Sequence, residues 1–230
     1  MLIHGFNKTT LLDYPGLVAA TVFTGGCNFR CPFCQNGDLV LNPMSQPVIP
    51  EEEILSHLEK RKGITQGLCI TGGEPTLNPD LKDFIKKVKA LGLKVKLDTN
   101  GYRPDVLKEL VSEGLIDYVA MDIKSSLDEY EHVAGVKLDT NKIKESIDFL
   151  ITGSLPFEFR TTVVKELHKE ASFEKIGSLI HGAEKYYLQA YVDSDRVIKP
   201  GFSSYTKEEL EAFLPGLKNH VKIVEIRGIE

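Results

Sequence analysis

Three of the four cysteines lie on one short stretch, Cys27-Asn28-Phe29-Arg30-Cys31-Pro32-Phe33-Cys34. They are too close together and too odd in number for a disulfide framework, and a structural zinc site takes four ligands. Three soft thiolates suit an iron–sulfur cluster better. In a cubane with four irons they would leave one iron without a protein ligand, where chemistry could take place. A three-cysteine zinc loop or a redox thiol cluster remains open as the alternative.

A buried strand is predicted directly before these cysteines, because residues 17–24 are β-prone and almost continuously apolar. Further strands are predicted over 67–71, 93–98, 116–123, 157–164, 185–192 and 221–226, and helices over 50–63, 78–92, 104–113, 140–151, 172–180 and 206–214. This alternation, without a linker or a break in composition, predicts one parallel α/β domain over 1–230. It has an extended segment at 1–16, a core at about 17–192 and a final helix and strand at about 203–228.

Polar signatures follow most of the predicted strands at their carboxyl ends, the edge at which chemistry collects in a parallel barrel. They are Gly72-Gly73-Glu74-Pro75, Asp98-Thr99-Asn100-Gly101 and Asp122 with Lys124, together with Arg160 and Gln189, which lie within the predicted strands 157–164 and 185–192. Each has an ordinary structural reading as a turn, a helix cap or an ion pair. Their occurrence in register with the cysteine stretch is the specific signal. Cys69 lies in an apolar run, which predicts a buried, inert thiol.

These motifs together resemble the radical S-adenosylmethionine (SAM) superfamily, including the aromatic Phe33 before the third cysteine. The segments 12–16 and 23–36 are similar to activating proteins of glycyl-radical enzymes, with the branch that activates anaerobic ribonucleoside-triphosphate reductase the most similar. The resemblance implies a partial TIM-type (β/α)6 barrel and a [4Fe-4S] cluster. It also implies reductive cleavage of SAM to a 5'-deoxyadenosyl radical, and a glycyl radical installed on a partner enzyme by hydrogen abstraction from a glycine Cα. A flavodoxin or ferredoxin would supply the electron.

The resemblance also implies roles for individual residues. The cluster ligands and catalytic residues would be Cys27, Cys31 and Cys34, and the residues around SAM would be Phe33, Gly72, Gly73, Glu74, Asp98, Asn100, Asp122, Lys124, Arg160 and Gln189. The two glycines would let backbone approach the methionyl ammonium, and Glu74 would organise their loop. Gln35 departs from the histidine that these activases often have, and the chain lacks the eight-cysteine insert of some of them.

The composition excludes several classes of function. The net charge is −5 with both signs interspersed, so neither nucleic acid nor a membrane surface is an expected partner. No signal peptide or membrane span is present in the sequence pattern, and we expect a cytoplasmic monomer. Two other functions stay open: a radical SAM enzyme that acts on a small molecule or peptide, and a non-catalytic iron–sulfur or zinc protein.

Overall fold

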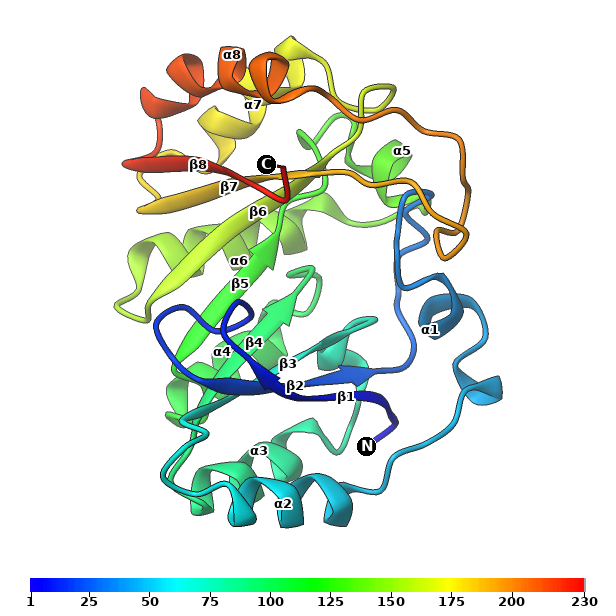
Figure 1. Ribbon diagram of the computed structural model, residues 1–230. Coiled ribbons are helices and arrows are strands. Elements are labelled where there is room, and N and C mark those ends of the chain that lie inside the picture. Colours follow the sequence, from blue (N-terminus) through cyan, green and yellow to red (C-terminus); the bar gives the residue numbers. More distant parts are fainter. Residues whose placement is uncertain (230) are drawn as a thin grey trace. The chain divides into compact units, whose positions relative to one another are not determined.

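The strands of the computed structural model, which describes residues 1–229, form one sheet of eight whose order follows the chain (Figure 1). They are β1 (Ile3–Thr10), β2 (Ala19–Thr24), β3 (Gly67–Gly72), β4 (Lys94–Thr99), β5 (Tyr118–Asp122), β6 (Phe157–Val163), β7 (Lys185–Ala190) and β8 (Ile223–Arg227). The helices are α1 (Gly37–Leu41), α2 (Glu51–Lys60), α3 (Leu81–Ala90), α4 (Pro104–Ser112), α5 (Tyr130–Ala134), α6 (Thr140–Thr152), α7 (Glu170–Leu179) and α8 (Lys207–Lys218). The predicted α/β fold with mostly parallel strands is confirmed, and it is consistent with the expected partial (β/α)6 barrel.

The N-terminal segment differs from the rest, because β1 pairs antiparallel with β2. Gly16, with a φ of 76°, belongs to the turn that reverses the chain between the two strands, so that Thr10 lies opposite Ala19. The sequence predicted extended backbone and a Pro-Gly turn here, but not the pairing. The short helices α1 and α5 were also missed, since five residues are too few for a helical period to be recognised. The prediction ended the last helix at Leu214, but α8 continues through Pro215 to Lys218.

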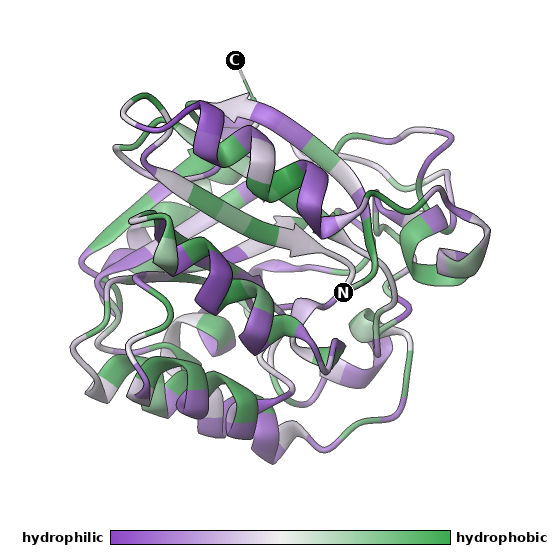
Figure 2. Cartoon of the chain, turned by 90° about the horizontal axis from the view of Figure 1, so that it is seen from below, coloured by the Kyte–Doolittle hydropathy of each residue, from purple (hydrophilic) through white to green (hydrophobic). Residues whose placement is uncertain are grey.

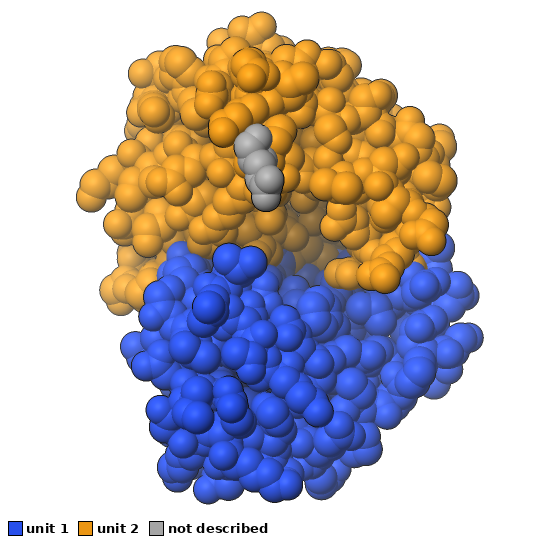
Figure 3. Space-filling view, in the orientation of Figure 1, with its two compact units in different colours: residues 1–28, 38–99, 103–119 blue, residues 29–37, 100–102, 120–230 orange. Residues whose placement is uncertain are grey.

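Two compact units make up the chain (Figure 3). Unit 1 comprises residues 1–28, 38–99 and 103–119. In it β2 lies parallel to β3, and β3 to β4. Helix α2 packs against α3 and β1. The predicted apolar face of α3 is buried at Leu81, Phe84, Ile85 and Val88. Hydrophilic residues occupy the other positions of such helices, so the colours alternate along them in Figure 2.

Unit 2 comprises residues 29–37, 100–102 and 120–230, of which the structure describes the chain to 229. Here β6, β7 and β8 are parallel neighbours, with α7 packed against α8 and α8 against β8. The core includes Phe159, Tyr186 and Leu188 from the strands and Phe173 and Ile176 from α7.

His168 ties together three segments of unit 2. Its ring is fully buried, its Nδ1 accepts the backbone N–H of Val164 at 3.0 Å, and its Nε2 lies 2.7 Å from the carbonyl oxygen of Lys124. This pattern requires the neutral tautomer with the proton on Nε2. The hydroxyl of Tyr205 donates to the His168 carbonyl at 2.7 Å. Burial lowers the pKa of His168, so the ring stays neutral in the folded chain.

We expect His168→Ala to lower the free energy of unfolding near neutral pH by about 1–3 kcal/mol, because Val164 N–H and Lys124 C=O lose a buried partner. The unfolded chain takes up the histidine proton at about pH 6.5, above the folded pKa, so this contribution is present above that pH and is lost as the pH falls. Denaturant unfolding at about pH 8 and pH 5.5 should therefore give the variant a shallower pH dependence than the wild type. The exposed His132→Ala is the control. Equal pH slopes for His168→Ala and wild type would contradict this role.

Candidate cofactor site

The cysteine stretch begins in unit 1 with Cys27 and continues in unit 2 with Cys31 and Cys34. None of its cysteines forms a disulfide within residues 1–229. Cys31 is buried, and Cys34, whose N–H donates to the Cys31 carbonyl at 3.0 Å, is partly exposed. Phe33 is buried between them, and its ring lies edge-on to His168 with centroids 6.2 Å apart. The predicted aromatic position is thus part of the core of unit 2.

Segments far along the chain hold the backbone of this stretch within unit 2. Arg30 N–H donates to Ala134 C=O at 2.9 Å, while the N–H groups of Lys199 and Ile198 donate to the carbonyls of Pro32 and Cys34 at 2.7 and 3.2 Å. A Cβ on Gly135 would lie 2.3 Å from the Arg30 carbonyl oxygen. The sequence analysis missed these supports. Only Gly135, the glycine directly after α5, could have suggested the contact with Arg30, because its φ is positive.

A charged group lies beside two of the cysteines. The Lys124 ammonium bonds to Asp122 at 3.1 Å, and Arg160 bonds to the same carboxylate at 3.0 Å. Burial raises the pKa of the Cys31 thiol to about 11, against the opposing effect of Lys124. Burial alone would lower the pKa of Lys124, but Asp122, Cys31 and Cys34 raise it above its usual range. The predicted residues Asp122, Lys124 and Arg160 therefore form one charged group next to Cys31 and Cys34.

The electrostatics of this group keep Asp122 ionised. Burial opposes its charge, but Lys124 and Arg160 outweigh burial and bring the pKa of the carboxyl from 3.8 to about 2. Gln189, the weakest of the predicted positions, lies half-buried on β7 with Thr162 and Arg227 as its neighbours on the adjoining strands. Within unit 2, the strand neighbours of Gln189 thus lie on β6 and β8. In the charged group, Asp122 lies on β5, Lys124 follows it, and Arg160 lies on β6.

The two glycines after β3 face backbone of unit 1. A Cβ on Gly73 would lie 1.9 Å from the carbonyl oxygen of Gly26, and one on Gly72, whose φ is +118°, would lie 2.3 Å from the nitrogen of Thr24. The N–H groups of Gly73 and Glu74 donate to the carbonyls of Thr24 and Gly26 at 2.9 and 2.8 Å. These two glycines thus lie against the backbone that leads into Cys27.

Glu74 organises the loop after β3, as expected. It is 1% exposed, and its Oε1 accepts bonds from the N–H and hydroxyl of Thr76 at 3.1 and 2.5 Å and from the Thr99 hydroxyl at 2.8 Å. Thr99 is the last residue of β4, so the Glu74 carboxylate connects the loop after β3 to the end of β4. Position 74 thus needs a carboxylate, because three donors from the loop and from β4 bond to it.

Asp98 lies over a buried lysine that the sequence analysis missed. The Lys96 ammonium is 2% exposed, bonds to Asp98, and lies 3.7 Å from the sulfur of Cys69. The Cys69 thiol donates to Asp98 at 3.6 Å. Cys69 is buried as predicted, but its sulfur also contacts the charged pair of Lys96 and Asp98. The alternation of a strand could have found Lys96, because it points to the same side as Asp98.

Asn100 and Gly101 make the turn that enters α4. The Asn100 side chain accepts the N–H of Tyr102 at 3.0 Å. Gly101 has a φ of +74°, and a Cβ there would lie 2.0 Å from the methyl carbon of Met121. Asn100 and Gly101 thus form a turn in unit 2, and Asn100 is 5% exposed.

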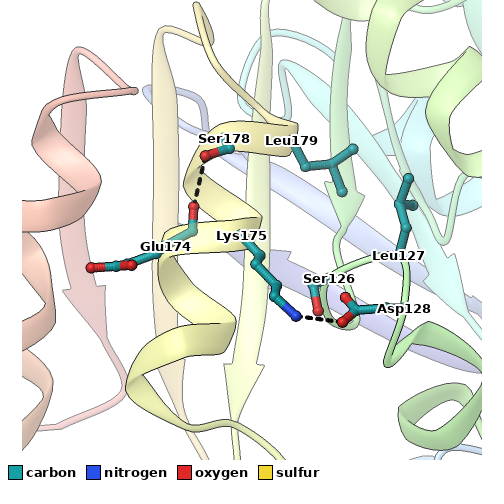
Figure 4. Close-up of a pocket in the computed structure, with 7 residues that line it drawn as sticks. All are labelled: Ser126, Leu127, Asp128, Glu174, Lys175, Ser178 and Leu179. Carbon is teal, nitrogen blue, oxygen red and sulfur yellow. Dashed lines mark hydrogen bonds and ion pairs between the residues drawn. The ribbon is translucent and has the colours of Figure 1, made fainter.

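A separate pocket in unit 2 lies between the segment 126–128 and α7 (Figure 4). It is lined by Ser126, Leu127, Asp128, Glu174, Lys175, Ser178 and Leu179. An ion pair between Lys175 and Asp128, both about half exposed, crosses it. Because none of the predicted site residues lines it, the pocket does not belong to the candidate site.

The donor set suits an iron–sulfur cluster. Three thiols lie on one short loop, and the Lys124 ammonium beside Cys31 and Cys34 can balance the negative charge that thiolates bring to a cluster. Over residues 1–229, the structure has no group of three His, Cys, Asp or Glu side chains placed to hold one metal ion. A cubane does not need three side chains around one ion, because each thiolate binds a different iron. No helix of the same residues is long and apolar enough to cross a membrane.

We expect Gly73→Ala to destabilise the chain by about 1–3 kcal/mol or more, because the new methyl group would overlap the Gly26 carbonyl and neither backbone can move freely. The matched control is Gly216→Ala in α8, where a Cβ meets nothing within 4 Å. Removing a glycine from a helix interior should stabilise the chain by about 0.5–1 kcal/mol. Denaturant unfolding of both variants tests this, and equal stabilities would contradict the steric argument.

The family model of the radical SAM superfamily matches residues 21–172. A protein of Methanocaldococcus jannaschii, provisionally named a glycyl-radical enzyme activating enzyme, is 33% identical over 199 residues, which are 84% of this chain and 81% of that protein. GTP 3',8-cyclase of Helicobacter pylori is 28% identical over 82% of this chain and 57% of its own. The solved structure of Streptococcus suis SuiB bound to S-adenosylmethionine has a TM-score of 0.69 at 14% identity, and covers 92% of this chain and 52% of that one. The match to the family model and the relative at 33% identity show that the chain, with its cysteine stretch and the charged group beside it, belongs to the radical SAM superfamily, as an enzyme with a [4Fe-4S] cluster and SAM as its cofactors.

Proposed function

We propose that this enzyme installs a glycyl radical on a partner enzyme, of the anaerobic ribonucleotide reductase or pyruvate formate-lyase type. The observation that carries the proposal is the similarity to a glycyl-radical enzyme activating enzyme over most of both chains. When bound, the reduced cluster supplies a 5'-deoxyadenosyl radical from SAM, and this radical takes a hydrogen atom from a glycine Cα.

The chain's own residues have three tasks in this proposal. Cys27, Cys31 and Cys34 hold the cluster. The charged group of Asp122, Lys124 and Arg160 holds polar ends of SAM, since a carboxylate, an ammonium and a guanidinium can each pair with a zwitterion. The charge of Lys124 also opposes the effect of burial, which raises the pKa of the Cys31 thiol.

The remaining predicted residues complete the surroundings of SAM. In unit 1 these are Gly72, Gly73, Glu74 and Asp98, and in unit 2 they are Phe33, Asn100 and Gln189. The bonds of Gly73 and Glu74 to backbone at 24–26 support a positioning role for that loop, since they set the backbone that leads to Cys27. The Lys96 ammonium donates a hydrogen bond to the Asp98 carboxylate and so orients it.

We further propose a flavodoxin or ferredoxin as electron donor, action as a monomer, and a cytoplasmic location. A reducing compartment is favoured because none of the cysteines within residues 1–229 forms a disulfide. Neither nucleic acid nor a membrane has a part in this function.

A second candidate function is radical chemistry on a small molecule, favoured by the similarity to GTP 3',8-cyclase over 82% of this chain. It uses the same cluster and SAM residues, so only the substrate separates the two. Turnover of SAM that depends on GTP and needs no protein partner would support this candidate.

Cys34→Ala should lower reductive SAM cleavage to the background level, because the cluster loses one of three ligands. The matched control is Cys69→Ala, which removes the fourth cysteine from the Lys96 and Asp98 cluster and should keep iron content and SAM cleavage. The measurements are iron and sulfide content and the yield of 5'-deoxyadenosine under anaerobic conditions. Cleavage retained by Cys34→Ala would refute the ligand assignment, and zinc without sulfide in the wild type would refute the cluster.

The partner is tested by anaerobic electron paramagnetic resonance of the reduced enzyme with SAM and a candidate glycyl-radical enzyme. We expect a doublet near the free-electron position that requires SAM and disappears when the partner's glycine is replaced by alanine. A cluster signal that SAM perturbs, without this doublet for any candidate partner, would count against glycyl-radical activation and favour the small-molecule reaction.

A further inference from the structure

Three side chains that have no part in the proposed function form a cluster across the last three strands of unit 2. The Nη1 and Nη2 groups of Arg227, at the end of β8, donate to Oε1 and Oε2 of Glu158 on β6 at 2.8 and 3.2 Å. On β7, between these two strands, the ring of Tyr187 lies under the guanidinium, with the Cζ atom of Arg227 3.2 Å from the ring centroid. Glu158 is 1% exposed, whereas the side chain of Arg227 is 36% exposed. The guanidinium is thus held on two sides and open to solvent on another.

The cluster lies on the same face of the sheet as the charged group beside the cysteines. Arg160, which bonds to Asp122, is two residues from Glu158 on β6, and alternate residues of a strand point to one face. On β7, Tyr187 is the neighbour of Arg160 in the strand register, and its ring contacts Arg227 in turn. This face therefore continues from the charged group, through Tyr187, to Arg227.

We propose that Arg227 binds a peptide carbonyl of the protein substrate, in the segment that carries the target glycine; this rests on the proposed function. A guanidinium has several N–H groups, and within residues 1–229 Arg227 uses only the two that Glu158 accepts. The others can donate to an oxygen of a bound chain. Strand β8 is the last of the sheet, and no strand of residues 1–229 pairs with its outer edge. An extended segment can therefore reach the exposed side of Arg227 there.

The charges around Arg227 favour a neutral oxygen over a phosphate. The Glu158 carboxylate compensates the guanidinium and occupies the two N–H groups whose fork geometry suits a carboxylate or a phosphate. The other charged side chains of β7 and β8 are Lys185 and Glu225, whose charges offset each other. A polyanion such as a nucleoside triphosphate needs unpaired cations. A peptide carbonyl needs only the N–H groups that remain.

Tyr187 and Glu158 act as positioning residues for Arg227. The ring below the guanidinium and the two bonds to the carboxylate fix the side chain before a substrate arrives. Binding therefore orders little of this side chain and loses little conformational entropy. Lysine could not take the place of Arg227, because only a planar guanidinium both stacks on a ring and bonds to a carboxylate through a fork.

The test measures glycyl-radical formation by the reduced, cluster-loaded enzyme with SAM at increasing concentrations of a candidate partner. We expect Arg227→Gln to raise the KM for the partner about tenfold or more, because a hydrogen bond from a charged donor is lost. Cleavage of SAM without the partner should keep its wild-type rate, since Arg227 contacts only Glu158 and Tyr187. The matched control Arg103→Gln removes a similarly exposed arginine that bonds to Asp105, and it should keep the wild-type KM.

A second variant separates substrate binding from a purely structural role. Glu158→Gln breaks the same ion pair but keeps the guanidinium, so it should leave the KM for the partner nearly unchanged. If the ion pair served only to fasten β8 to β6, Glu158→Gln and Arg227→Gln would raise the KM alike.

The outcomes distinguish this proposal from the proposed function. Iron content and circular dichroism show whether each variant is folded. A wild-type KM for Arg227→Gln, or equal effects of Arg227→Gln and Glu158→Gln, would overturn the role of Arg227 and leave glycyl-radical activation in place. Wild-type enzyme that forms no glycyl radical with any candidate partner would overturn both. Cleavage of SAM that depends on GTP and is lost in Arg227→Gln would assign the residue to a nucleotide site instead of a peptide site.

Discussion

The absence of a side chain at Gly73 is the constraint on which the rest of unit 1 depends. Because its Cα lies against the Gly26 carbonyl, the loop after β3 can bond to the backbone that leads out of β2. Those bonds fix the chain immediately before Cys27. Glu74 then holds the same loop to the end of β4 through Thr99. A steric requirement at one residue thus determines where the first cysteine of the loop begins.

Unit 2 holds its part of the cysteine loop by different means. Backbone bonds from 134 and 198–199 fix the loop, and Lys124 brings a positive charge to Cys31 and Cys34. Asp122 and Arg160 hold that ammonium, and His168 bonds to the Lys124 carbonyl from the other side. A buried ammonium is costly unless it is paired, so this arrangement stabilises a charge that a thiolate-bound cluster requires. Backbone hydrogen bonds and the Lys124 charge therefore both act on the cysteine loop.

Much of the fold could be predicted from the sequence. Strands such as β2 and β3 are runs of apolar residues, and helices such as α3 show an apolar face, because each is buried by its immediate neighbours. Elements whose partners lie elsewhere were missed: the antiparallel pairing of β1, the short helix α5, and the part of α8 beyond Pro215. Their stability comes from tertiary contacts, which leave no period in the local sequence.

The sequence by itself determined the chemistry, since three thiols at that spacing and the motifs near the ends of most strands specify the family and its cofactors. Only the tertiary structure decided what those motifs touch. It showed that Gly72 and Gly73 face backbone, that Lys96 is buried beneath Asp98 beside Cys69, and that Arg227 reaches Glu158 across β7. The physical reason is that residue type sets which bonds a group can make, whereas the partner depends on segments brought together by folding.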